Sequence, residues 1–182
     1  MRLSFLNLFL TLVVSAEVVD YSAVNNEIDN ISSMISTMST DAAALVPGIP
    51  GLSFALQMNI DSISLDKRIK HATATAEASD TFGTVGSLSV GLKLISLEPK
   101  ISSVLQSIAS KNETFAGLGI VVLYSLVQLK NDTDAFGKAI VTKLDTLEAG
   151  LAPVIMSSID SAFDSAISAF QSQANQPANV IS

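Results

Sequence analysis

Apolar residues recur at spacings of three and four along most of the chain, which is the pattern of amphipathic α-helices. Within 17–40 the stripe is unbroken, and its members are Tyr21, Val24, Ile28, Ile31, Ile35 and Met38. Two prolines and two glycines in 46–51 then predict a loop, because neither residue type supports a regular helical ladder.

The segment 52–80 carries two apolar stripes on roughly opposite sides of its predicted helix. One stripe consists of Leu52, Leu56, Ile60 and Ile63, and the other of Leu65, Ile69, Ala72 and Ala76. A helix that is apolar on two faces usually packs between neighbours. We therefore predict a central helix of a bundle, and the alternative is that one of the two faces lines a cavity.

Three further stripes complete the pattern, over 85–108, 122–140 and 156–170. Pro99 predicts either one bent helix or two nearly collinear ones in the first of them. A turn is expected at 115–119 and a break at Gly150 and Pro153. The chain is thus predicted to be an all-α bundle of five or six amphipathic helices, mostly antiparallel, with one helix kinked at a proline.

The first sixteen residues, MRLSFLNLFLTLVVSA, have the pattern of a secretory signal peptide. Arg2 precedes an apolar run, and small residues stand at the expected cleavage site. The alternative is a membrane anchor, but the run is shorter than the ~20 residues that span a bilayer. We expect a signal peptide at 1–16, a helical domain at 17–172 and a flexible tail at 173–182. The product is predicted to be extracellular and without a lipid anchor, since no long apolar tail ends the sequence.

Composition removes several classes of function. The 182 residues carry a net charge of −7, which disfavours binding to nucleic acid. No cysteine is present, so disulfides, thiolate catalysis and zinc–thiolate sites are excluded. His71 is the sole histidine and lies among cations in the sequence, and Asp132 and Asp134 lack the spacing of a calcium loop. The residues predict no enzymatic activity, no cofactor and no metal site.

Three N-x-[ST] triplets are candidate acceptors for N-linked glycans, at Asn30, Asn112 and Asn131. Asn112 is the best candidate, because its neighbours predict a loop. Asn30 points away from the apolar stripe of its helix, which is compatible with a glycan or with plain solvent.

An ordered set of short motifs in the second half resembles a known family. Leu97-Glu98-Pro99 precedes the apolar run 101–108, and Lys111 and Phe115-Ala116 follow it. The later motifs are Leu129-Lys130, Thr133 to Phe136, Ala139-Ile140, Ile159 to Phe163, Ala166-Ile167 and Ala169-Phe170. Together with the signal peptide and the absence of cysteine, they resemble the fungal hydrophobic surface binding protein A family, which is related to cell wall galactomannoproteins of the MP1 type.

The resemblance implies a secreted or cell wall associated helical protein without catalytic activity. Members of the family adsorb to hydrophobic surfaces and recruit a polyester-degrading, cutinase-like hydrolase, and the related galactomannoprotein domains bind long-chain fatty acids inside the bundle. The predicted partners are therefore fatty acids, other apolar ligands and hydrophobic surfaces, with a secreted hydrolase as a further partner. The residues predicted to line a lipid site are Leu92, Ile95, Leu126, Phe136, Ile159 and Phe163. The alternative is a secreted or cell wall structural and antigenic glycoprotein with a closed core and no ligand.

Overall fold

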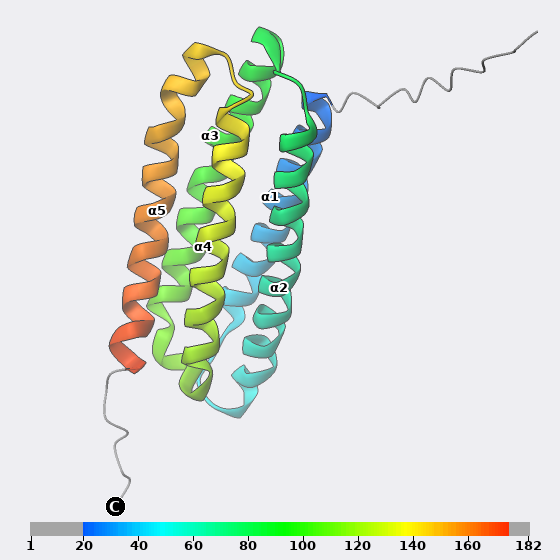
Figure 1. The fold of residues 1–182 in the computed structure, drawn as a ribbon. Coiled ribbons are helices and arrows are strands. Elements are labelled where there is room, and N and C mark those ends of the chain that lie inside the picture. Colours follow the sequence, from blue (N-terminus) through cyan, green and yellow to red (C-terminus); the bar gives the residue numbers. More distant parts are fainter. Residues whose placement is uncertain (1–19, 175–182) are drawn as a thin grey trace, which may run out of the picture.

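The computed structural model describes residues 20–174, and almost all of them are helical (Figure 1). The α-helices are α1 (Tyr21–Ala44), α2 (Ile49–Ala78), α3 (Gly83–Ser110), α4 (Gly119–Val141) and α5 (Thr146–Ala174), and a 3₁₀ helix, η1 (Asn112–Leu118), precedes α4. No β-strand occurs in residues 20–174, so the predicted all-α bundle is confirmed, with five α-helices.

Consecutive helices run in opposite directions along the bundle, α1, α3 and α5 one way and α2 and α4 the other (Figure 1). Each helix packs mainly against two others, in the order α1, α2, α4, α5, α3 and back to α1. The bundle is therefore a closed ring. The contacts α1–α3, α3–α5 and α2–α4 join helices of the same direction, so antiparallel packing is confined to α1–α2 and α4–α5.

A ring of five helices encloses more interior space than the commoner bundle of four. Helices about 9.5 Å apart lie about 8 Å from a common axis in a regular ring of five, but about 7 Å in a ring of four. Side chains from every helix must reach this axis to fill the centre. Where aliphatic side chains are too short to meet, a cavity remains.

The structure corrects the predicted start of the second helix. The sequence predicted a loop over 46–51, but α2 already begins at Ile49. Pro50 stands in the first turn, where its missing N–H removes no helical hydrogen bond. Gly48 has a φ of 83°, a left-handed value that glycine adopts without steric cost, and it turns the chain into the helix.

The two later prolines lie inside helices. α3 runs without interruption through Pro99, so the segment is one helix and not two. The predicted break at Gly150 and Pro153 is wrong, because α5 begins at Thr146 and continues through both residues. Pro99 and Pro153 are exposed, so water can hydrate the carbonyl that each proline leaves unpaired one turn earlier, while Leu97 and Ala152 anchor the same turns in the core.

The prediction that α2 packs between neighbours on both apolar faces is also wrong. The stripe Leu65, Ile69, Ala72 and Ala76 is buried, as expected for a core face. The opposite stripe is half-exposed, with exposed fractions of 48–55% for Leu52, Leu56, Ile60 and Ile63. α2 therefore covers the core with one face and presents an apolar face to solvent with the other.

Two of the predicted divisions of the chain fall at its ends. The signal peptide 1–16 lies outside the described residues. Of the predicted flexible tail, residues 173 and 174 belong to α5, and residues 175–182 lie outside the described part.

Candidate binding site

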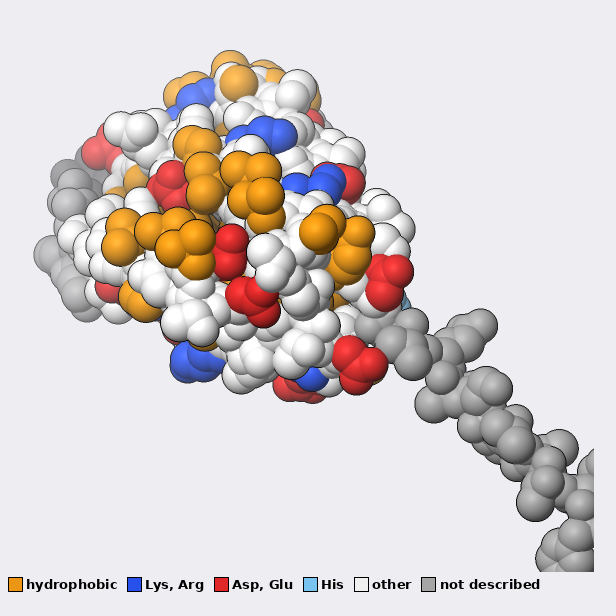
Figure 2. Space-filling model, turned by 90° about the horizontal axis from the view of Figure 1, so that it is seen from above, with side chains coloured by type: hydrophobic (Ala, Val, Ile, Leu, Met, Phe, Trp, Pro, Cys, Tyr) orange, Lys and Arg blue, Asp and Glu red, His pale blue; other side chains and the backbone are white. Residues whose placement is uncertain are grey.

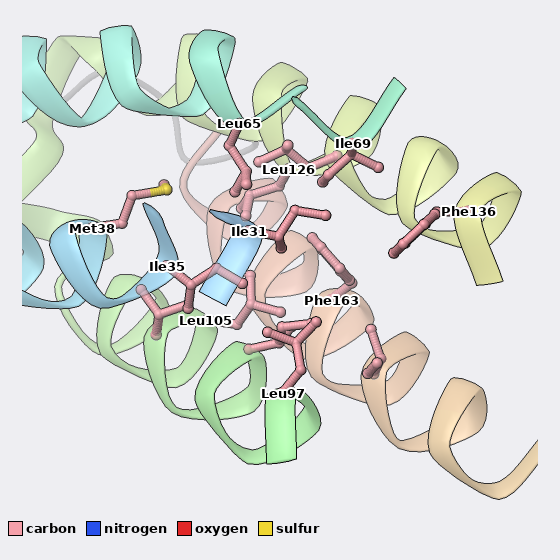
Figure 3. Packing of buried hydrophobic residues seen from close by; sticks show 14 of the residues in the cluster. Ile31, Ile35, Met38, Leu65, Ile69, Leu97, Leu105, Leu126, Phe136 and Phe163 are labelled. Atoms are coloured by element: carbon pink, nitrogen blue, oxygen red, sulfur yellow. The ribbon is translucent and has the colours of Figure 1, made fainter. Parts of the chain in front are cut away.

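The centre of the ring contains a cavity whose wall is almost wholly apolar. All five α-helices and η1 contribute to it, and Figure 3 shows side chains from α1 to α5 that point into the same interior. Typical members of the wall are Ile35, Leu105, Leu126 and Phe163. Its polar members are Asn59, Ser62, Ser125 and Thr133.

The cavity is larger than a packing defect. The centre of a water molecule can occupy about 80 Å³ of it, and one buried water needs roughly 10–15 Å³ on this measure. Empty space lined by aliphatic and aromatic side chains stays dry and accepts apolar ligands. A long acyl chain fills more volume than this, so its entry requires the surrounding side chains or helices to move apart. An interior of Ile, Leu, Val and Met tolerates such repacking at low cost.

A second, smaller apolar cavity of about 50 Å³ lies between α3, α4 and α5. The wall that separates it from the central cavity consists of residues that line both, namely Leu97, Ile101, Thr133 and Phe136. Ile159 and Met156 complete the smaller cavity on the α5 side. The Phe136 ring is therefore part of the boundary between the two spaces.

The 3₁₀ helix η1 closes one end of the ring, because it packs against α2, α4 and α5. Its Phe115 lines the central cavity and meets Phe170 edge to face, with ring centroids 5.5 Å apart. The Asn112 amide donates a hydrogen bond of 3.0 Å to the carbonyl of Ala169. These contacts fix the closed end of the cavity to α5.

A polar groove follows the outside of the contact between α2 and α4. It is more open than the central cavity and holds about 420 Å³ on the same measure. Asn59, Ser62, Ser125 and Leu129 line both the groove and the central cavity. A single layer of side chains therefore separates the two.

Carboxyl groups meet across this groove. Asp66 on α2 and Asp132 on α4 lie within hydrogen-bonding reach of each other. The Lys70 ammonium is 2.8 Å from Asp66 and 3.5 Å from Asp132. Burial raises the pKa of Asp132, and the neighbouring Asp66 carboxyl raises it further. The hydrogen bond with Asp132 lowers the pKa of Asp66.

Comparison with known proteins shows the family to which the chain belongs. The family model described as Hydrophobic surface binding protein A matches residues 21–142. The chain belongs to this family. The family assignment made from the sequence motifs is thereby confirmed. No curated protein sequence matches the chain significantly.

Solved structures share the fold. AFMP4P in complex with palmitic acid is 28% identical, with a TM-score of 0.79, covering 83% of this chain and 99% of that one. Ligand binding domain 2 of Penicillium marneffei MP1, complexed with multiple arachidonic acids, is 21% identical, with a TM-score of 0.76 and coverage of 83% and 96%. Ligand binding domain 1 of the same protein, with arachidonic acids, is 15% identical, with a TM-score of 0.76 and coverage of 82% and 98%.

Four of the six residues predicted to line a lipid site are buried in this member of the family. Leu126, Phe136 and Phe163 line the central cavity, and Ile159 lines the smaller one together with Phe136. Whether they contact a lipid stays a prediction. Leu92 and Ile95 are 55% and 48% exposed and line neither cavity, so their expected place in an interior lining is corrected.

Several wall residues were missing from that prediction. They include Ile31, Ile35 and Met38 on α1 and Leu97, Ile101 and Leu105 on α3. Each lies on an apolar stripe that the sequence shows. The stripes do not reveal which of them converge, because the ring joins helices that are not consecutive in the chain.

The remaining candidates are the three predicted glycosylation sites and the histidine. Asn30 and Asn131 are exposed, whereas Asn112 lies in η1 instead of a loop and uses its side chain in hydrogen bonds with Ala169 and the Glu113 backbone. Glycosylation of the three stays a prediction. His71 is largely exposed and lies 3.1 Å from Glu27. Within 20–174, no group of three potential metal ligands occurs, and no helix is long and apolar enough to cross a membrane.

Proposed function

We propose that this protein binds the acyl chain of a long-chain fatty acid in the central cavity, as a non-enzymatic carrier or sequestering protein. The observation that carries the proposal is the almost wholly apolar cavity, to which every α-helix of the ring contributes. The likeness to AFMP4P, whose structure contains palmitic acid, supports the same ligand class. Transfer of each buried methylene group from water contributes about 0.8 kcal/mol, so a long chain supplies the energy needed to widen the ring.

Adsorption to hydrophobic surfaces is the second function that we propose, because a different set of residues favours it. The outer α3–α5 residues, as we call them, are the exposed apolar side chains Val85, Leu88, Leu92, Ile95, Leu147, Leu151 and Val154. A comparable outer α2–α4 set consists of Leu52, Leu56, Ile60, Ile63, Ile120, Val121, Tyr124 and Val127. Figure 2, which views the end where α3 and α5 begin, shows hydrophobic patches separated by polar and charged side chains. Exposed apolar surface of this extent is typical of proteins that bind apolar partners.

We extend the proposal to location and partners on the basis of the sequence. The signal peptide pattern at 1–16 supports secretion to the cell exterior or the cell wall. A protein adsorbed through its outer residues would leave the rest of its surface available to a secreted hydrolase. The closed-core glycoprotein alternative is disfavoured by the cavity.

A pair of substitutions in adjacent residues of α2 tests the carrier proposal. Ala55 is buried and lines the central cavity, whereas its neighbour Leu56 is 49% exposed. Ala55→Phe fills the cavity and should weaken binding of a fluorescent fatty acid at least tenfold, at a cost in stability of about 1–3 kcal/mol. Leu56→Phe adds an aromatic ring outside and should bind like the wild type. Equal uptake by the two folded variants, judged by circular dichroism, would remove the cavity as the binding site.

A further inference from the structure

The groove between α2 and α4 is the place where a ligand could keep a polar head in contact with water while its chain lies in the central cavity. Three of the four polar residues of the cavity wall, Asn59, Ser62 and Ser125, also line the groove. Elsewhere the described wall is apolar apart from Thr133. A charged head group buried against apolar residues would lose its hydration without compensation. The α2–α4 side avoids this cost.

The groove also contains a cation that can attract an anionic head. Lys70 lines it and keeps 51% of its side chain exposed, so the ammonium can reorient toward a ligand. In residues 20–174, Lys70 is the one cation within ion-pair distance of Asp66 or Asp132. The Gln128 amide is the other polar partner of the pair, and it donates a hydrogen bond of 3.0 Å to Asp132.

The charge of this cluster depends on one proton. The Asp66 and Asp132 side chains are only 20% and 12% exposed, so their mutual repulsion is poorly screened by water. When Asp132 carries the proton, Asp66 and Lys70 balance each other and the cluster is neutral. When both carboxyl groups are ionised, the cluster has a net negative charge and repels an incoming anion.

We propose that the α2–α4 groove holds the anionic head group of a ligand whose chain lies in the central cavity, and that the affinity for this head group rises when the Asp66–Asp132 pair takes up a proton. The inference rests on the proposed carrier function and names the head-group site and the control of that function. The raised pKa of Asp132, caused by burial and by Asp66, places the change above the pH range in which an ordinary aspartate titrates.

The test uses two ligands with the same chain, because a fatty acid itself titrates in this range. Dodecanesulfonate is anionic at every pH used, and dodecanol is uncharged. Calorimetric titration from pH 4 to pH 8 should show sulfonate binding that weakens about three- to tenfold as pH rises. Dodecanol binding should stay constant.

Matched charge removals locate the effect. Asp132→Asn should abolish most of the pH dependence for the sulfonate, whereas Asp164→Asn, which removes an exposed carboxylate on α5, should leave it intact. Lys70→Met supplies a second reading at pH 4, where sulfonate affinity should fall and dodecanol affinity should not.

The outcomes separate this inference from the function on which it rests. Wild-type binding of both ligands without a pH effect, or an unchanged pH effect in Asp132→Asn together with unchanged sulfonate affinity in Lys70→Met, overturns the head-group site and leaves the carrier function standing. Failure of both ligands to bind at any pH overturns the carrier function as well.

Discussion

The wall of the central cavity and the outer α3–α5 residues are made of the same residue types at the same helical spacing, yet they face opposite surroundings. Leu126 and Phe163 on the wall are 3% and 4% exposed, whereas Leu92 and Val154 on the outside are 55% and 72% exposed. The helices contain more apolar residues than the interior of a five-membered ring can enclose. The surplus lies at the surface.

We propose that the two regions serve two kinds of apolar binding. The enclosed wall can surround a single chain and exclude water from all sides of it. The outer residues can contact only an extended surface. On adsorption, each of them buries only the part of its side chain that is exposed in the free protein. Substitutions in one region should therefore leave the other activity unchanged.

A charge on the cavity wall should have the largest effect. Leu126→Asp places an unpaired carboxylate in an apolar interior and should lower the free energy of unfolding by about 3–5 kcal/mol. Fatty acid uptake should be lost. Leu92→Asp makes the same change on the half-exposed side of α3 and should alter stability by less than about 1 kcal/mol, with normal uptake. Chemical denaturation and a fluorescent uptake assay measure both effects, and a comparable loss of uptake in the two variants would contradict the division.

Loss of the outer residues should have an intermediate effect, and it should weaken adsorption to surfaces instead of fatty acid uptake. Replacing Leu88, Leu92 and Ile95 by serine removes about 1 kcal/mol of burial energy per residue, since each is roughly half-exposed already. Adsorption to polyester beads should weaken at least tenfold, measured as depletion from solution, while uptake of the fluorescent fatty acid stays unchanged. Undiminished adsorption would show that another face carries the surface binding.

The smallest expected effect is a pH dependence of stability, which arises at the helix contacts beside the cavity. Carboxyl pairs join α1 to α2 (Asp41–Asp61), α2 to α4 (Asp66–Asp132) and α4 to α5 (Asp134–Asp160). The α1–α3 and α3–α5 contacts instead contain Lys93–Asp29 and a hydrogen bond from Ser158 to Glu98. Burial, followed by the neighbouring carboxyl, raises the pKa of Asp41, Asp132 and Asp134.

These shifts determine how stability depends on pH. A carboxyl whose pKa is raised by folding contributes stability that is present below its unfolded pKa and is lost as pH rises through the folded pKa. Folding lowers the pKa of Asp66, so this carboxyl contributes stability above its unfolded pKa. That stability is lost as pH falls through the folded pKa. We expect a melting temperature about 2–4 °C higher at pH 5 than at pH 8, which corresponds to about 1 kcal/mol. Combined Asp41→Asn, Asp132→Asn and Asp134→Asn should flatten this slope, and a wild-type melting temperature that rises with pH would contradict the account.

The sequence predicted the helices because each apolar stripe encodes one face of a local, regular structure. It could not predict which stripes meet. Leu92 and Leu126 lie on equally regular stripes, and only the order of helices in the ring decides that one is exposed and the other buried. A break was expected at Pro153, but the helix continues because water can hydrate the carbonyl that this exposed proline leaves unpaired. The sequence could not show this, since the exposure of Pro153 is a property of the assembled bundle.

The charged site was inaccessible to sequence reasoning for the same reason. In the sequence, Asp132 lacks the spacing of a calcium loop, and nothing local marks it as one of an interacting pair. Its partner Asp66 lies on another helix, and the two meet because α2 and α4 run side by side in the same direction. Likewise, the sequence does not show that Ser62 and Ser125 belong to the cavity wall, because this depends on the contact between α2 and α4.

A crystal structure of the protein with bound palmitate tests the central claim most directly. We predict an acyl chain inside the ring, in contact with Leu97, Leu126 and Phe163, with the helices further apart than in the empty protein. A chain bound solely against the outer α3–α5 residues, with the interior unchanged, would contradict the account.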